Sequence, residues 1–172
     1  MLDPARIRST GRAVDAVATG VHRGLPPAEM VRLAARRNFD SVRADPYVPL
    51  WLALWAKHGE DDRVRALLHD HYAAVTTRLL PAYEAILGAS GRAPRPPFTT
   101  ESIAVAVTAL NQGLALRIAV DPDAVPGDLP APPAAGAQGE DPWDLFGALA
   151  MTLLHGMTEE VPGPDGGGEG PS

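Results

Sequence analysis

The fold is decided by residues 25–68, which read LPPAEMVRLAARRNFDSVRADPYVPLWLALWAKHGEDDRVRALL. The Pro-Pro pair at 26–27 begins a helix, because proline at the first helical position loses no intrahelical hydrogen bond. The Asp-Pro pair at 45–46 begins a second helix, and residues 47–55 are almost uninterruptedly apolar, which is typical of a helix buried on all sides. Gly59 ends this helix. The stretch predicts two helices and the start of a third, joined by short turns.

Similar start and stop signals lie on both sides of this stretch. An Asp-Pro pair at 3–4 begins a helix that ends near Gly24. Asp61 or Asp62 caps a long helix, which we expect Pro81 to kink because proline removes one backbone hydrogen bond.

The second half of the chain predicts two more helices. We expect residues 91–98 to form a loop and Thr99 to cap a helix that ends before a proline-rich connector at 121–140. That connector is expected to be mobile, the Asp-Pro pair at 141–142 to begin the sixth helix, and residues 161–172 to form a disordered tail. No alternating strand pattern occurs, so the sequence predicts an all-α fold of about six helices in one domain, residues 1–160.

The composition excludes several classes of protein. The 172 residues include no cysteine, so disulfides, thiol nucleophiles and zinc-thiolate sites are ruled out. No run of 18 apolar residues and no N-terminal apolar signal occurs, so we expect a cytoplasmic protein that does not span a membrane. His69 and His71 lie two residues apart on a predicted helix and point in different directions, so they do not share a metal ion. We expect no cofactor, no metal and no enzymatic activity.

The net charge of −6 is unevenly distributed. Residues 1–43 hold eight arginines and four acidic residues, whereas the rest of the chain is strongly acidic. A solvated helix face explains this distribution better than a surface for phosphates does, although both interpretations stay open.

Two segments resemble the C-terminal half of tetracycline-repressor (TetR) family regulators. Residues 25–68 resemble the second and third regulatory helices of that family and the start of the next. Residues 111–125, NQGLALRIAVDPDAV, resemble its penultimate helix, in which a run of a small residue, Gly-Leu-x-Leu, ends in Asp-Pro. The resemblance extends from about residue 24 to 160. It implies an all-α regulatory domain, a homodimer formed by the last two helices, and a small-molecule pocket between the middle helices.

Residues 1–24 depart from the family pattern. Family members begin with three short helices that include a helix-turn-helix, and this segment has room for only one helix. We therefore expect a regulatory domain without its DNA reader, so that this chain alone does not contact DNA.

The last two predicted helices carry leucines and glycines on one stripe, which suits a four-helix bundle across a two-fold axis. Ala106, Gly113, Gly147 and Gly156 are positions that allow close approach of two helices. The expected dimer interface comprises Leu110, Gly113, Leu114, Leu149, Leu153 and Gly156. The alternative is that these helices pack only within one chain.

Aromatic and amide side chains on the middle helices are the candidates for a ligand pocket, which needs apolar walls and a few polar groups. They are Phe39, Trp51, Trp55, Tyr72, Asn111 and Gln112, with His155 as a weaker candidate. Core filling is the alternative for the tryptophans, and a hydrogen bond across a dimer is the alternative for the amides.

The sequence thus favours a regulatory domain that binds a small, hydrophobic effector and homodimerises. The alternative is an interaction protein that forms heterodimers with a full-length TetR-like repressor.

Overall fold

A computed structural model describes residues 4–44, 48–136 and 141–162 of the chain. Its elements follow in the order α1 (Pro4–His22), α2 (Pro27–Arg43), α3 (Val48–Lys57), α4 (Asp62–Ser90), β1 (Arg92–Pro94), α5 (Thr100–Val120), η1 (Pro122–Ala124), η2 (Pro133–Ala135), α6 (Leu145–Gly156) and β2 (Thr158–Glu160). The predicted all-α fold with six helices is confirmed for the described part of the chain.

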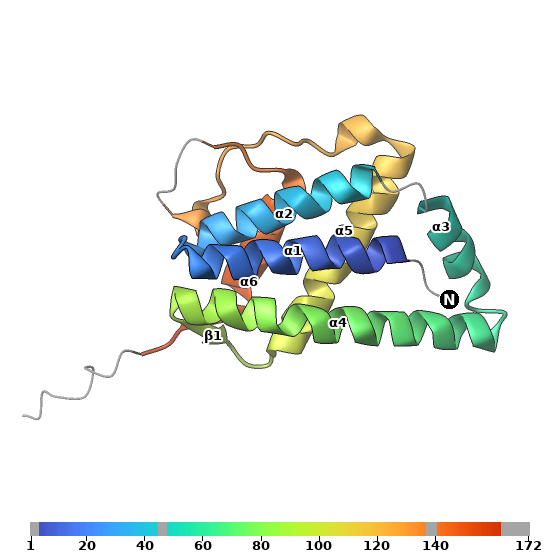
Figure 1. Cartoon of the computed structure of the whole chain (residues 1–172), viewed down its shortest axis with the longest axis horizontal. Coiled ribbons are helices and arrows are strands. Elements are labelled where there is room, and N and C mark those ends of the chain that lie inside the picture. The colour runs from blue at the N-terminus through green and yellow to red at the C-terminus, as the bar shows by residue number, and fades with distance from the viewer. Residues whose placement is uncertain (1–3, 45–47, 137–140, 163–172) are drawn as a thin grey trace, which may run out of the picture.

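The helices form two layers (Figure 1). α1 lies between α2 and α4 in one layer, and α5 and α6 cross behind it. α3 stands at one end, where it connects α2 to α4. The core therefore forms between the two layers, with α2 packed on α6 and α4 packed on α5.

Side-chain caps fix where α4 and α5 begin. Asp61 accepts hydrogen bonds from the backbone N–H groups of Arg63 and Val64 at the start of α4. Thr99 and Ser102 form a reciprocal capping box at the start of α5. The caps at Asp61 and Thr99 are those that the sequence predicts, because these side chains satisfy N–H groups that have no partner inside the helix.

Large apolar side chains fill the core. Ile103 is fully buried and Trp143 is 1% exposed. Phe39 of α2, Tyr83 of α4 and Phe146 of α6 belong to the same cluster. The core thus draws on both layers and on the residue that leads into the last helix.

The prediction that the third helix is buried on all sides is wrong. Trp51 is buried, but the side chains of Leu50, Leu52 and Trp55 are 53%, 40% and 44% exposed. α3 stands at the end of the layers, so the described elements cover only one of its sides. The predicted cap at 45–46 lies outside the described residues, and Gly59 does not take the left-handed conformation expected of a helix terminator.

The connector after α5 takes a defined conformation over residues 121–136, while its mobility stays a prediction. Residues 121–136 contain the short helices η1 and η2, and Val125 and Ala135 are buried. Leu129 and Trp143 exchange two backbone hydrogen bonds of 2.6 and 2.8 Å. The connector is thereby held to the segment that leads into α6.

The last helix begins at Leu145, later than the Asp-Pro pair at 141–142 predicts. Trp143 is engaged in its pairing with Leu129, and Asp144 is the N-cap, whose Oδ1 accepts from the N–H of Gly147 at 2.7 Å. The true cap is therefore the second aspartate of the segment.

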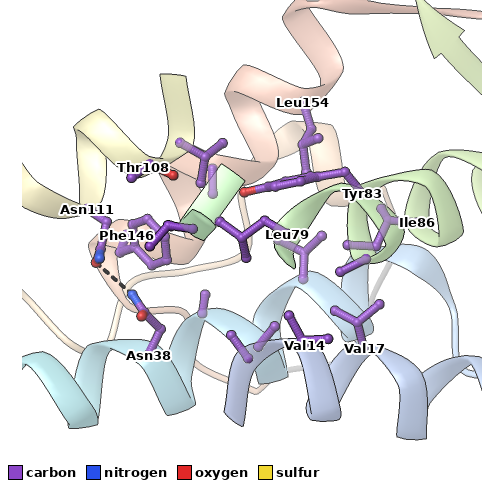
Figure 2. A pocket seen from close by; sticks show the side chains of 18 residues that line it. Val14, Val17, Asn38, Leu79, Tyr83, Ile86, Thr108, Asn111, Phe146 and Leu154 are labelled. Carbon is purple, nitrogen blue, oxygen red and sulfur yellow. Dashed lines mark hydrogen bonds between the residues drawn. The ribbon is translucent and has the colours of Figure 1, made fainter. Parts of the chain in front are cut away.

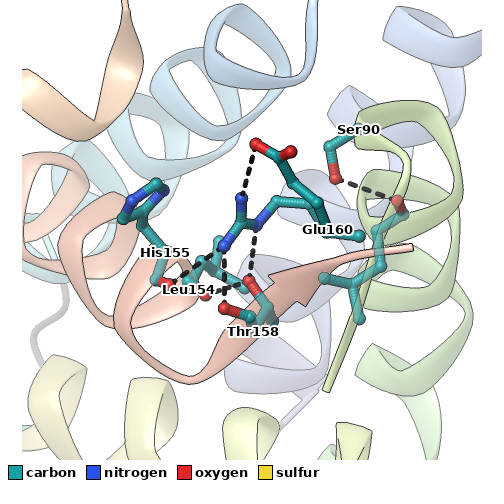
Figure 3. A network of polar contacts seen from close by, with 7 residues as sticks. Ser90, Leu154, His155, Thr158 and Glu160 are labelled. Carbon is teal, nitrogen blue, oxygen red and sulfur yellow. Dashed lines mark hydrogen bonds and ion pairs between the residues drawn. The ribbon is translucent and has the colours of Figure 1, made fainter. Parts of the chain in front are cut away.

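The described residues also contain one short pair of strands that the sequence pattern does not reveal, because β1 and β2 pair antiparallel. The Arg92 guanidinium fixes this pair (Figure 3): it donates to the Thr158 hydroxyl at 2.8 Å and to the Thr158 carbonyl at 2.7 Å. Strands of three residues are too short to show the alternation by which strands are recognised. The pair ties the end of α6 to the turn between α4 and α5.

α5 is, among the described residues, long and apolar enough to cross a membrane by length and composition. The criterion of 18 uninterrupted apolar residues did not detect it. Length and composition are weak grounds for a membrane span, and α5 packs on α4 and α6 in the fold.

Candidate functional site

A cavity of about 110 Å³ lies between the two layers (Figure 2). Five helices contribute to its wall: α1, α2, α4, α5 and α6. The apolar lining residues are Ala13, Val14, Val17, Val31, Ala34, Ala35, Val75, Leu79, Ala82, Ile86, Val107, Phe146, Ala150 and Leu154.

Helical periodicity explains why these residues share one cavity. Val31, Ala34, Ala35 and Asn38 recur every three or four residues on α2, and residues 75–86 repeat this spacing on α4. Small alanines on four of the helices face the space, and their short side chains do not reach its centre. The cavity thus arises where apolar stripes meet through small residues.

Two amides from different helices meet in the wall. Asn38 of α2 donates through Nδ2 to Oδ1 of Asn111 of α5 at 2.6 Å. Asn38 is 9% exposed. This bond joins the two layers at one end of the cavity (Figure 2).

Two hydroxyl groups also face the cavity. The Oγ1 of Thr108 is buried and has no hydrogen-bond partner among the described residues. The Tyr83 ring extends along the wall with its hydroxyl pointing away from Leu154 and toward the Thr108 side (Figure 2). Burial raises the pKa of Tyr83, so its hydroxyl stays protonated at neutral pH.

The predicted pocket residues separate into two groups. Asn111 lines the cavity, whereas Phe39, Gln112, Trp51, Trp55 and Tyr72 are not among the lining residues. Phe39 instead belongs to the buried core.

The aromatic residues form their own cluster between α3 and α4. The Trp51 ring stacks on His71 with centroids 4.7 Å apart, and the Trp55 indole donates to the Tyr72 hydroxyl at 2.9 Å. They miss the cavity because α3 stands at the end of the layers rather than between them. His155 is exposed, and its carbonyl oxygen accepts from Arg92.

Sequence reasoning missed Asn38, Thr108 and Tyr83. A signal was present for Asn38, because it continues the buried stripe of Val31 and Ala35 at helical spacing. A polar residue within such a stripe is a candidate for a buried hydrogen bond. Thr108 and Tyr83 carry no comparable signal, since both suit an ordinary core helix.

The residues expected at a dimer interface also divide. Gly113, Leu149 and Gly156 are exposed and Leu153 is half-buried, whereas Leu110 and Leu114 pack against the core of the same chain. We call the exposed apolar residues of these two helices the outer α5–α6 face: Val105, Gly113, Leu116, Val120, Leu149 and Gly156.

Two of the four small positions serve contacts within the chain. Ala106 packs against the core, and Gly147 is buried where α6 meets α2. A Cβ atom at Gly147 would lie 3.0 Å from the Cβ of Ala35. Gly113 and Gly156 have open space around them within the chain.

The described residues include no group of three or more histidines, aspartates or glutamates placed to hold a metal ion. The lining residues of the cavity include no charged side chain either.

Comparison with known proteins gives one match. The family described as BetI-type transcriptional repressor, C-terminal, matches residues 27–129, more than half of the chain, from α2 through α5 and into the connector. No curated protein and no solved structure matches the chain. The match includes the two segments whose resemblance the sequence suggested, so the chain belongs to the TetR family of transcriptional regulators through its C-terminal regulatory domain.

Proposed function

We propose that this domain regulates transcription by binding a small effector in the cavity between its two helix layers. The observation that carries the proposal is the cavity itself, whose wall is largely apolar and includes a few hydrogen-bonding groups. This is the composition of a small-molecule site. A cytoplasmic location, the absence of catalysis and the absence of DNA contact by this chain alone belong to the same proposal.

The small volume of the cavity supports the proposal that a bound effector changes how the helices are arranged. About 110 Å³ is less than the roughly 300–1,000 Å³ of typical ligand pockets. Even a single-ring effector needs a space of roughly 150 Å³, so it must separate the helices around it. A ligand shifts a conformational equilibrium only by its preference for one arrangement, and such separation provides that preference.

The outer α5–α6 face supports homodimerisation. Val105, Leu116 and Val120 are 55%, 44% and 82% exposed along one helix. Exposed apolar side chains that recur on one helix are typical of an interaction surface. A homodimer pairs this face with its own copy, while the alternative, a heterodimer with a full-length TetR-like repressor, would use the same face.

The effector site is tested with a substitution that fills the cavity. Ala34→Leu places three more carbon atoms in the space, and we expect single-ring compounds that raise the melting temperature of the wild-type chain to lose at least tenfold in affinity. A thermal-shift titration over ligand concentration measures this change.

Ala73→Leu is the matched control, because Ala73 lies on the exposed side of α4. The control is expected to bind the same compounds as the wild type. If Ala34→Leu binds them equally well, the cavity is not the effector site.

A further inference from the structure

We infer that the effector is an uncharged molecule, either a single ring or a short chain, with a hydroxyl or carbonyl oxygen at one end. That oxygen forms hydrogen bonds with Thr108 and Asn111. The inference rests on the proposed function, since it specifies the ligand of the same cavity. It stands on the distribution of polar groups around the space, on their hydrogen bonding and on the absence of charge in the wall.

The hydrogen-bonding groups gather at one end of the cavity. Asn38, Thr108 and Asn111 lie together at that end, whereas Val17, Ile86 and Leu154 lie at the other (Figure 2). A ligand with one polar end and one apolar end matches this distribution. A molecule with polar groups at both ends would leave one of them without a partner, at a cost in binding free energy.

Thr108 differs from three other threonines that lie within helices of this chain. Thr19, Thr77 and Thr152 each donate to the carbonyl oxygen four residues earlier, at 2.7 to 2.9 Å. Thr108 makes no such bond, although its Oγ1 is buried. A buried hydroxyl without a partner is costly, and a ligand oxygen would supply the missing hydrogen bond.

The amide pair leaves hydrogen-bonding capacity beside Thr108. Asn111 lies one helical turn after Thr108 and uses its Oδ1 to accept from Asn38. The structure shows no further bond from either carboxamide to the described residues, so the Asn111 Nδ2 remains a donor. A hydroxyl or carbonyl oxygen accepts from this donor and pairs with the Thr108 hydroxyl.

The absence of charge in the wall excludes ionic ligands. Among the lining residues, only Asn38, Tyr83, Thr108 and Asn111 are polar, and none of them is charged at neutral pH. An ion entering this space would lose its hydration without gaining a counter-charge, which costs far more than burying a neutral group.

The volume limits the size of the ligand. An apolar cavity of about 150 Å³ is known to take up benzene, and the space here is about 110 Å³. A single ring or a short chain with one oxygen is therefore the class of ligand that enters with the least separation of the helices.

The test uses four probes of similar size with the full 172-residue chain: benzyl alcohol, toluene, benzoate and benzylammonium. Isothermal titration calorimetry measures their affinities. We expect benzyl alcohol and toluene to bind and the two ions to bind at least 100-fold more weakly than benzyl alcohol. We expect Thr108→Val to lower the affinity for benzyl alcohol about tenfold and to leave that for toluene within twofold.

Two further variants separate this result from a general effect on folding. Thr108→Ser keeps a hydroxyl group and is expected to retain the wild-type affinity for benzyl alcohol. Thr77→Val, on the exposed side of α4, is the matched control and is expected to change neither affinity.

The failure of the inference and that of the proposed function give different results. If toluene binds but Thr108→Val affects benzyl alcohol and toluene equally, or if the ions bind as tightly as benzyl alcohol, the ligand class is wrong while the effector site stands. If none of the four probes binds, the proposed effector site is wrong, and the inference fails with it.

Discussion

At the scale of the residue, Asp144 carries two opposing effects. Its Oδ1 caps α6, whereas its Oδ2 is buried and has no hydrogen-bond partner among the described residues. Burial raises the pKa of Asp144 above its ordinary value of 3.8, and the Gly147 N–H group and the charge of Arg36 partly oppose this shift. Asp144 thus caps the start of α6, but its burial disfavours the charged form of its carboxyl group.

Asp144→Asn separates these two effects, because asparagine is also a good cap but carries no charge. The folded chain holds the Asp144 proton more tightly than the unfolded chain does. The free energy of unfolding of the wild type therefore falls as the pH rises from about 3.8 through the folded-state pKa. We expect the stability of Asp144→Asn relative to wild type to increase over this range, as measured by urea unfolding.

Asp144→Ala is the control for the cap and should be about 1 kcal/mol less stable than Asp144→Asn at every pH. If the free energy of unfolding of Asp144→Asn minus that of the wild type falls as the pH rises, the charged carboxylate is not unfavourable in the folded chain.

At the scale of the element, the close approach of α2 and α6 depends on Gly147. Alanine there would gain about 1 kcal/mol of helix propensity. Its Cβ atom would press on the Cβ of Ala35, which cannot rotate away because it is fixed to the backbone of α2. Overpacking of this kind costs roughly 1–3 kcal/mol.

We therefore expect Gly147→Ala to lower the free energy of unfolding by about 1 kcal/mol, as measured by chemical denaturation. Gly88 of α4 is the matched control, because a Cβ atom there meets nothing within 4 Å. Gly88→Ala should raise stability by up to about 1 kcal/mol. If Gly147→Ala stabilises the chain as much as Gly88→Ala does, α2 and α6 can move apart without a cost in stability.

At the scale of the whole molecule, the proposed association of two copies depends on the outer α5–α6 face. Leu116→Glu would place a charge in the proposed interface, where it would lose its hydration without a partner. We expect a wild-type dimer at micromolar concentration and an at least 100-fold higher dissociation constant for Leu116→Glu, with unchanged helix content. Sedimentation equilibrium and circular dichroism measure both quantities.

Val21→Glu is the control, because Val21 is 46% exposed on α1, away from this face. It should remain a dimer. A wild-type chain that is monomeric under these conditions would refute homodimerisation and favour the heterodimer alternative.

The sequence predicts the helices of this fold better than it predicts their surroundings. Caps such as Asp61 and Thr99 are local, so their effect can be read from neighbouring residues. The exposure of Trp55 depends on what lies beyond the end of α3, which its own apolar pattern does not reveal. The conformation of the connector likewise depends on a distant partner, since Leu129 pairs with Trp143.

The candidate site was less predictable than the fold. Asn111 was found because an amide within an apolar helix is conspicuous, but its partner Asn38 lies 73 residues earlier in the chain. The cavity exists where several small side chains fail to meet, and this depends on the packing of five helices together.

α6 presents cavity residues on one side, Phe146 and Ala150 among them, and Leu149 and Gly156 on its exposed side. The helix is anchored at its start through Trp143 and after its end through Arg92. A ligand in the cavity and a second copy of the chain would therefore contact opposite sides of α6, a helix that is held in place at both ends. If the ligand changes the equilibrium constant for self-association by some factor, thermodynamic linkage requires that self-association changes the affinity for the ligand by the same factor.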